Sequence, residues 1–213
     1  MNGPDLWSRV HTAAREEGLA PALALLCAPQ GPAGPPYGPR GHAVLPGTDV
    51  APLPDGATVL DTVPLPGGSV TLLRLRDGAA DPPPPAPEGF TQGLAWLRLG
   101  LSQWLCRQVM AYLATRNVGG APLLRQQLVK GAIADTVGEH LELRETLEAA
   151  GADPLDAGTL GDLHRQLTVT DRAQVRLLGA RGYLAEGPGH AAYLSELLAE
   201  AYLNETGPSG RVD

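Results

Sequence analysis

The stretch MAYLATRNVGGAPLLRQQLVKGAIAD, residues 110–135, decides how the second half of the chain folds. It begins as an apolar helical pattern, is interrupted by Gly119, Gly120 and Pro122, and then resumes apolar residues at helical spacing. Glycine ends helices because it tolerates left-handed backbone, and proline suits the first turn of a new helix. Arg116 lies just before the interruption. The stretch therefore predicts two long helices joined by a tight turn, as in a helical bundle.

The pattern predicts further helices around this turn. The first, from about Thr91 to Thr115, is apolar nearly all round and is therefore expected at the centre of the bundle. The others are expected at about 122–150, at about 159–180, and after Gly187-Pro188-Gly189. The inward positions expected from their spacing are Leu124, Leu128, Ile133, Val137, Leu141 and Leu147 in the second helix, Leu163, Leu167, Leu177 and Leu178 in the third, and Leu194, Leu197, Leu198 and Ala201 in the fourth.

The sequence before residue 77 predicts shorter helices and strands than the sequence after residue 90. Residues 4–18 predict a helix, and the apolar run Ala22–Ala28 predicts a short buried strand. Three more strands are expected at 42–45, 58–63 and 69–76, and Pro66-Gly67-Gly68 is expected to turn the last two into a hairpin.

A proline-rich segment, residues 77–89, separates these two parts. It cannot form helix or central strand, and a stiff linker is its expected role. The sequence thus predicts a segment 1–88, with a helix, a few antiparallel strands and the linker, followed by a four-helix bundle over 89–213. The expected fold class is mostly α with a small α+β segment in front.

Composition bounds the function. The net charge of −7 argues against a nucleic-acid partner. No apolar run is long enough to span a membrane, and the N-terminus does not resemble a signal peptide, so a cytoplasmic protein is expected. The two cysteines are far apart, and Cys106 is expected to be a small buried hydrophobe.

The sequence lacks the residues that several classes of reaction require. Inward Glu-x-x-His pairs for a di-iron site are absent, and no phosphate loop or nucleophile elbow occurs. No metal site and no catalytic residue can be assigned. Asp162 and His164 are two positions apart, so they do not share a helical face and are expected at the surface.

The order of elements from about 89 to 204 resembles the C-terminal helical domain of the acyl-CoA dehydrogenases. That family's Arg-x-Gln-Phe-Gly-x-Pro-Leu corresponds to Arg116–Leu123, and the Gln that opens its next helix corresponds to Gln127. Its Gln-x-x-Gly-Gly-x-Gly-Tyr corresponds to 176–183, and its Tyr-Glu-Gly-Thr to 202–205. The register holds without a gap from Gly182 to Tyr202.

This resemblance implies site residues. Members bind FAD between subunits through the first two motifs, which implies cofactor contacts by Arg116, Gln127, Gly179 and Gly182 and substrate contacts by Tyr183 and Tyr202. The chain departs from the pattern at three decisive positions. Val118 and Gly119 replace the Gln and Phe that hold the flavin, and Leu203 replaces the glutamate that removes the α proton of the thioester. Glu205 is the nearest carboxylate along the chain, in a position that does not suit a replacement base.

The resemblance therefore implies a truncated, degenerate family member, from a biosynthetic or acyl-metabolism setting, that does not dehydrogenate on its own. Three functions stay open. The first is a subunit of a homo- or hetero-oligomer that pairs with a full-length, flavin-bearing dehydrogenase acting on acyl thioesters, with FAD only at their interface. The second is a cofactor-independent cyclase, isomerase or lyase that reuses the acyl-binding cavity. The third is a purely structural oligomerisation module.

Overall fold

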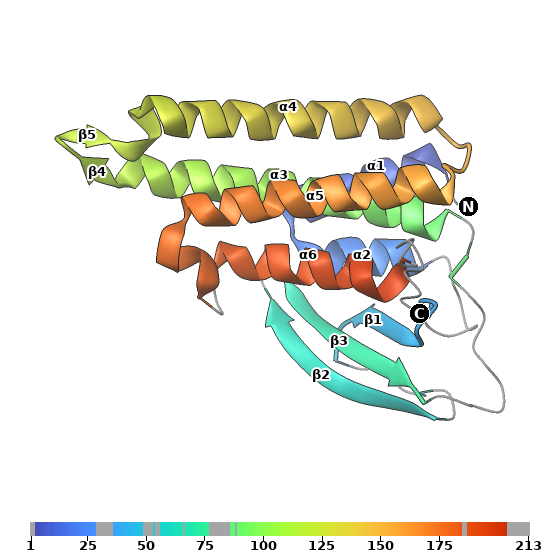
Figure 1. Ribbon diagram of the computed structural model, residues 1–213. Coiled ribbons are helices and arrows are strands. Elements are labelled where there is room, and N and C mark those ends of the chain that lie inside the picture. Colours follow the sequence, from blue (N-terminus) through green and yellow to red (C-terminus); the bar gives the residue numbers. More distant parts are fainter. Residues whose placement is uncertain are drawn as a thin grey trace, which may run out of the picture.

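The computed structural model describes residues 3–28, 36–48, 53, 56–65, 67–76, 86–87, 89–184 and 187–203. Long helices form a bundle, and a small antiparallel sheet packs against one side of it (Figure 1). Most of the proline-rich linker, Pro66 of the expected hairpin turn and Glu205 lie outside the described residues. In the described part, no helix is both long enough and apolar enough to cross a membrane.

Helix α3 (Phe90–Thr115) is the central element of the bundle, as its apolar sequence predicts. It contacts α1 (Pro4–Glu16), α2 (Leu19–Cys27), α4 (Gln127–Ala150), α5 (Ala157–Leu177) and α6 (Pro188–Tyr202). Its buried side chains occur on all sides, which is why a one-sided apolar stripe is missing from its sequence. Cys106 lies among them with 4% of its surface exposed, as predicted.

The N-terminal helices belong to the same apolar core as the bundle. One core cluster contains residues from α1, α2, the sheet, α3 and α6. The strand predicted at Ala22–Ala28 is wrong, because Ala22–Cys27 belong to α2 and Ala28 follows its last turn. Leu19, Leu23 and Leu26 are buried at helical spacing, and a run of alanine and leucine without β-branched residues favours helix over strand.

The sheet has the strand order β1-β3-β2 and is antiparallel throughout. Strands β1 (His42–Pro46), β2 (Ala57–Leu65) and β3 (Gly68–Leu75) confirm the three predicted strands and the β2–β3 hairpin. Val44 and Val70 pack in the core that the sheet shares with the helices. Leu73 and Leu75, on the other face of β3, form a smaller cluster with Tyr37.

The turn between α3 and α4 is more elaborate than predicted. A two-stranded hairpin, β4 (Asn117–Val118) and β5 (Ala121–Pro122), is followed by a 3₁₀ turn at Leu123–Arg125, and α4 therefore begins five residues later than expected. Gly119 and Gly120 have φ of 61° and 82°. Two positive φ angles in a two-residue hairpin loop are what its tight twist requires, and glycine adopts them without strain.

The predicted inward face of α4 is partly wrong. Leu128, Val137 and Leu141 are 89%, 43% and 56% exposed, whereas Leu147 is buried as expected. The buried positions of α4 are Thr136, His140, Leu143 and Leu147. Two of these four are polar: His140 hydrogen-bonds Ser102 inside the bundle, and the Thr136 hydroxyl donates to Ala132 O within α4. The spacing of the leucines therefore predicted the wrong face. In α5 and α6, Leu163, Leu167, Leu194, Leu198 and Ala201 are buried, as predicted.

Candidate functional site

Two arginines from the two family-like motifs meet at one aromatic ring. Arg116 directly follows α3, and its guanidinium carbon lies 5.7 Å from the centre of the Tyr112 ring. Arg181, in the 3₁₀ turn Gly179–Tyr183 between α5 and α6, lies 5.3 Å from the centre of the same ring. Both arginines are exposed. Cations over an aromatic face are held by its quadrupole, so the Tyr112 ring holds both arginine side chains at one end of the bundle.

The other residues expected at the cofactor do not join that pair through any described contact. Gln127 is exposed at the first turn of α4. Gly179 has a φ of 56°, the backbone conformation that lets the chain leave α5. A Cβ on Gly182 would lie 2.7 Å from the carbonyl oxygen of Val175, so the missing side chain lets the turn pack against α5.

The two tyrosines expected at the substrate lie apart. Tyr183 is 77% exposed in the 3₁₀ turn. Tyr202 is 4% exposed near the end of α6, where its ring packs edge-on against Phe90. The Tyr202 hydroxyl oxygen accepts a hydrogen bond from the backbone N–H of Val44, at 2.9 Å, so it satisfies a donor of strand β1. Burial raises the pKa of Tyr202.

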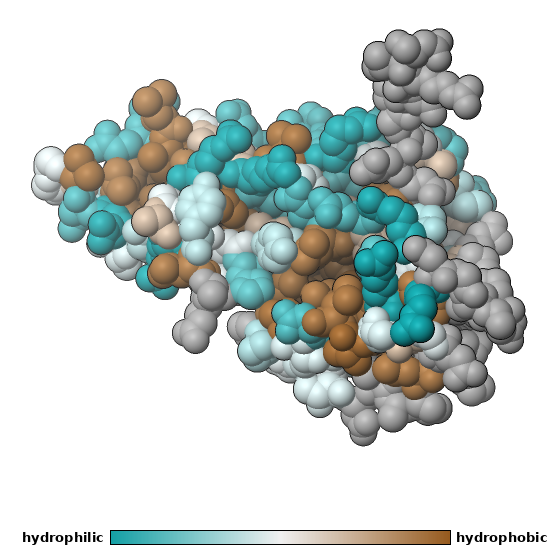
Figure 2. Space-filling view, turned by 60° about the horizontal axis from the view of Figure 1, so that its bottom comes forward, coloured by the Kyte–Doolittle hydropathy of each residue, from teal (hydrophilic) through white to brown (hydrophobic). Residues whose placement is uncertain are grey.

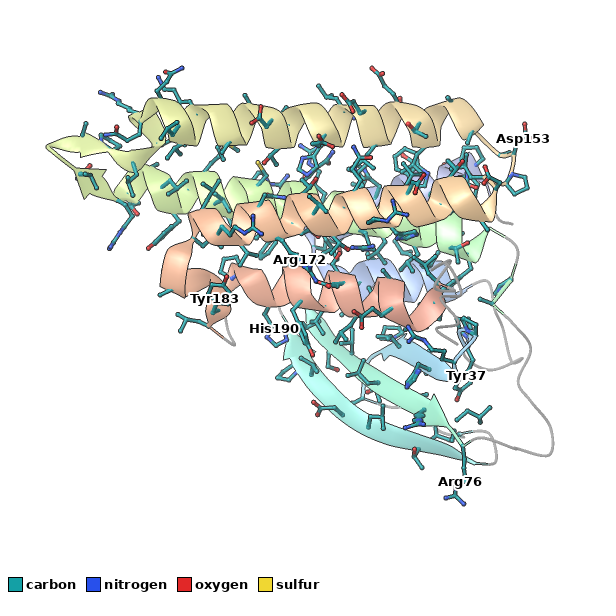
Figure 3. The ribbon with its side chains drawn as sticks, in the orientation of Figure 1. Tyr37, Arg76, Asp153, Arg172, Tyr183 and His190 are labelled. Atoms are coloured by element: carbon teal, nitrogen blue, oxygen red, sulfur yellow. The ribbon has the colours of Figure 1, made fainter. Side chains whose placement is uncertain are left out.

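A cavity of about 520 Å³ opens between α5, the 3₁₀ turn and α6. Tyr183 and Gly182 are part of its wall, together with Arg172, His190 and Tyr193. Figure 3 shows Arg172 on α5 and His190 on α6 at this junction, with Tyr183 at the turn. Asp171 also lines the cavity, although only 2% of the residue is exposed. The cavity wall thus includes exposed aromatic side chains and the almost completely buried residue Asp171.

Behind this cavity, Arg98 is completely buried in the middle of the bundle. Its Nε donates to Ser195 Oγ at 2.9 Å, and one terminal nitrogen donates to Thr168 Oγ1 at 2.8 Å. The other terminal nitrogen donates to both Nδ1 and the backbone oxygen of His164, each at 3.0 Å. The guanidinium therefore connects α3, α5 and α6 through one hydrogen-bonded group. Burial lowers the pKa of Arg98 to about 10, so it stays protonated at neutral pH.

Asp171 is the acidic member of this network. The Ser195 hydroxyl that accepts from Arg98 donates to Asp171 Oδ2 at 3.3 Å. Burial raises the pKa of Asp171 to about 6, although Arg98 and the hydroxyls of Ser102 and Ser195 favour the carboxylate. A carboxyl group with that pKa exchanges its proton near neutral pH.

Two histidines complete the network, and one corrects the sequence prediction. His164 was expected at the surface with Asp162, but it is 1% exposed. An arginine can only donate, so His164 Nδ1 accepts and its Nε2–H donates to Thr91 O at 3.2 Å. Burial lowers the pKa of His164 to about 3. The prediction failed because the buried side of α5 is partly polar. Asp162, in contrast, is exposed as expected.

His140 of α4 shares a 2.8 Å hydrogen bond with Ser102 Oγ, which also accepts from Gln174 Nε2 at 3.0 Å. Burial lowers the pKa of His140 to about 4. One residue in the sequence indicates this network, although the spacing of apolar residues does not. Arg98 lies in a helix that is apolar on nearly all sides. Its charge therefore cannot point to solvent and needs partners inside the protein.

The residues at the motif positions fit only part of a flavin nucleotide. Arg116 and Arg181 supply cations suited to a pyrophosphate. Val118 is 55% exposed and Gly119 has no side chain, so the stacking ring and the amide of the family pattern have no counterpart there. The described residues also contain no group of three or more histidine, cysteine or acidic side chains placed to hold a metal ion.

Comparison with known proteins supports the fold. The ChsE4–ChsE5 complex from Mycobacterium tuberculosis aligns at a TM-score of 0.51 with 23% identity, over 78% of this chain and 52% of that chain. Butyryl-CoA dehydrogenase from Megasphaera elsdenii aligns at 0.49 with 17% identity, over 76% and 52%. The first of these alignments confirms the predicted mostly-α fold. This chain spans about half the length of both structures.

The sequence comparisons support the fold less than the structural comparison does. No protein-family model matches the chain. One curated relative, named short-chain dehydrogenase sdnK from Sordaria araneosa, is 32% identical over 112 residues, which are 50% of this chain and 30% of that protein. A match to less than a third of a protein does not carry that protein's activity.

Proposed function

We propose that this chain is a subunit that associates with a flavin-bearing acyl-CoA dehydrogenase subunit and contributes Arg116 and Arg181 to the flavin site at their interface. The partner would dehydrogenate an acyl thioester. This chain would supply cationic contacts and no base, because Leu203 stands where the family pattern has its glutamate. The meeting of the two arginines at Tyr112 is the observation that carries the proposal.

Exposed apolar side chains around the same end of the bundle support an interface there. Val118 in the β4–β5 hairpin is 55% exposed, and Leu184, just after the 3₁₀ turn, is 59% exposed. Figure 2 shows apolar groups at the left end of the bundle, where Figure 1 places the hairpin. Large exposed apolar side chains that gather near fixed charges are common at protein interfaces. A structure of similar fold is itself a complex of two named proteins.

Co-expression with acyl-CoA dehydrogenase subunits from the same genome tests this function. We expect a complex that carries FAD absorbance, while the chain purified alone is colourless. Arg116→Gln and Arg181→Gln should each lower FAD retention by about tenfold, because a charge-assisted hydrogen bond contributes about 1.5–3 kcal/mol. Arg165→Gln, at an exposed position on α5, is the matched control. A stable complex whose FAD content is unchanged by both variants would contradict the proposed role of the arginines, and the absence of any complex would overturn the proposal.

A second candidate is the cofactor-independent enzyme, and the cavity beside Asp171 favours it. A carboxyl group with a pKa of about 6, placed in the wall of a cavity, can act as a proton donor or acceptor. Incubation of the isolated chain with acyl thioesters in deuterated water, followed by mass spectrometry, tests this function. Deuterium uptake that Asp171→Asn abolishes would support it, and no exchange or product would exclude it for the thioesters used.

A further inference from the structure

Helix α4 carries an apolar stripe on a side that faces away from the rest of the bundle. Its main contacts are with α3, α5 and the 3₁₀ turn that precedes it, and it forms an outer layer of the bundle (Figure 1). Ala134, Val137 and Leu141 follow one another at intervals of three and four residues, so they share one side of the helix. All three are exposed, Val137 to 43% and Leu141 to 56%. Adjoining apolar side chains at the surface are typical of protein interfaces.

A charge of opposite sign lies at each end of this stripe. Lys130 precedes the stripe by one helical turn, and Glu145 follows it by one turn. Neither side chain forms an ion pair with a described residue, and both are exposed. The neighbouring cation, Arg144, is already paired with Glu148 at 2.6 Å. The outer face of α4 therefore has a positive end, an apolar middle and a negative end.

This order of charges is complementary to itself in one orientation. In an antiparallel pair of α4 helices centred between Val137 and Gly138, Lys130 of each copy faces Glu145 of the other. Opposite charges that face each other across an interface fix its register and orientation. A parallel pair would instead place Lys130 against Lys130 and Glu145 against Glu145, and like charges repel. The charges thus favour an antiparallel second copy of this chain as the occupant of the face.

The middle of the stripe suits the same register. Ala134 of one copy then faces Leu141 of the other, and Val137 faces Gly138, so each larger side chain meets a small residue. The packing of the single chain does not require the glycine, because a Cβ on Gly138 would meet no atom within 4 Å. Glycine inside a helix is unfavourable relative to alanine. A second helix that lies close against α4 would account for its position.

We propose that two copies of this chain pair through antiparallel α4 helices, with Lys130 of each copy against Glu145 of the other. The paired face does not include Arg116, Val118 or Leu184, which belong to the proposed contact with a flavin-bearing subunit. The pairing is therefore independent of that function. One pair of helices buries less than the roughly 1,600 Å² of a standard interface, so a dissociation constant in the micromolar range is expected.

Exchange of the two charges tests the pairing. Sedimentation equilibrium of the intact chain alone, from about 1 to 300 µM, measures the dissociation constant. Lys130→Glu and Glu145→Lys should each raise it about fivefold or more, because each places like charges together at both ends of the contact. The double variant should return to within about twofold of the wild type, since its charges attract again.

This recovery reports on a second copy, because Lys130 and Glu145 of one chain lie about 22 Å apart along α4. A chain that stays monomeric over the whole range, or a double variant as weak as the single variants, would overturn the proposal.

A matched pair of substitutions tests the apolar middle. Leu141→Glu places a charge in the paired face and should raise the dissociation constant about tenfold or more. Leu128→Glu makes the same change at a position of α4 that is 89% exposed and outside the stripe, so the constant should change by less than about twofold. Circular dichroism confirms that both variants fold. Equal effects of the two substitutions would refute the assigned face.

Cross-linking locates the contact directly. Lys130 is the only lysine of the chain, so a carbodiimide can join this one side-chain amine to a carboxylate that lies against it. A mixture of unlabelled and ¹⁵N-labelled chains, digested and analysed by mass spectrometry, distinguishes links between copies from links within one copy. We expect Lys130 joined to Glu145 of the other copy. Cross-linked dimers in which Lys130 is joined to no residue of α4 would refute the register.

Discussion

Arg98 and Asp171 form a buried pair of opposite charges that touch the same hydroxyl and not each other. Ser195 Oγ accepts from Arg98 at 2.9 Å and donates to Asp171 at 3.3 Å. The pair links α3 to α5 through a residue of α6. Each charge depends on the other, because an isolated ion in a protein interior loses its hydration without compensation.

Removal of the arginine should therefore destabilise the protein strongly. We expect Arg98→Met to lower the free energy of unfolding by about 3–5 kcal/mol, as measured by urea denaturation. Arg98→Met combined with Asp171→Asn should cost less than the sum of the two single substitutions, since the second removes the unpaired charge. Arg165→Met, which breaks an exposed pair with Asp162, should cost at most about 1 kcal/mol. Equal losses at Arg98 and Arg165 would contradict the described network.

Stability should fall as the pH drops below neutral. His140 and His164 have folded-state pKa values lowered to about 4 and about 3, so their stabilising contribution is complete above the unfolded value of 6.5 and is lost as pH falls toward the lowered values. Each histidine contributes a slope of up to about 1.4 kcal/mol per pH unit in this window. Asp171 acts in the opposite direction, because its raised pKa makes the folded state less stable as pH rises through about 6.

Thermal unfolding between about pH 7 and pH 4 measures this balance, and the two histidines should outweigh the single aspartate. His140→Gln keeps a polar nitrogen near Ser102 and removes one titrating group, so it should flatten the dependence. A Tm that stays constant over this range, or a variant with the wild-type slope, would argue against the neutral buried histidines.

The close packing of α1 on α3 should depend on Gly100. A Cβ there would lie 2.5 Å from the carbonyl oxygen of His11 and 2.8 Å from Ala14 Cβ. Gly100→Ala should thus push the helices apart and cost about 1–3 kcal/mol, even though alanine is the better helix former. Gly131→Ala in α4 meets no atom within 4 Å and should stabilise by about 0.5–1 kcal/mol. Opposite signs for these two substitutions, measured by denaturation, are the expected result.

The hydroxyl of Tyr202 should stabilise the edge of the sheet. Tyr202→Phe leaves the buried N–H of Val44 without the acceptor it now has at 2.9 Å, so a loss of about 1–3 kcal/mol is expected. Tyr193→Phe, at an exposed position, should change stability by less than about 0.5 kcal/mol. Hydrogen exchange at Val44 gives an independent reading: its amide should exchange faster in Tyr202→Phe and not in the control.

The sequence predicts the architecture better than the interior. Helix α3, the three strands of the main sheet and their hairpin follow from local patterns of apolar residues and turn residues. The run Ala22–Ala28 misled because a short apolar run does not distinguish strand from buried helix. Leu128 and Leu141 misled for another reason. The buried face of α4 is determined by the helices that pack against it, and the local spacing of apolar residues does not reveal those partners.

Local sequence patterns predict even less of the candidate site than of the packed helix faces. The family motifs identified Arg116 and the segment 176–183, and in the structure Arg116 and Arg181 both lie near the Tyr112 ring. The network of Arg98, Asp171 and His164 spans 66 or more residues between α3 and its partners, so no local pattern could assemble it. The predicted division at residue 88 and the assigned cofactor and substrate roles stay predictions.

The contact between β1 and α6 has a consequence for how the chain is made. Val44 and Tyr202 are 158 residues apart, and backbone atoms of Gly38 and Ala201 come so close that a Cβ on Gly38 would overlap the Ala201 carbonyl. During synthesis, these contacts between the sheet edge and α6 therefore cannot form until α6 has emerged from the ribosome. Contacts of such large sequence separation also slow refolding. We expect the N-terminal helices and strands to remain exposed to proteases on the nascent chain until α6 is released, which pulse proteolysis of stalled chains of increasing length can measure.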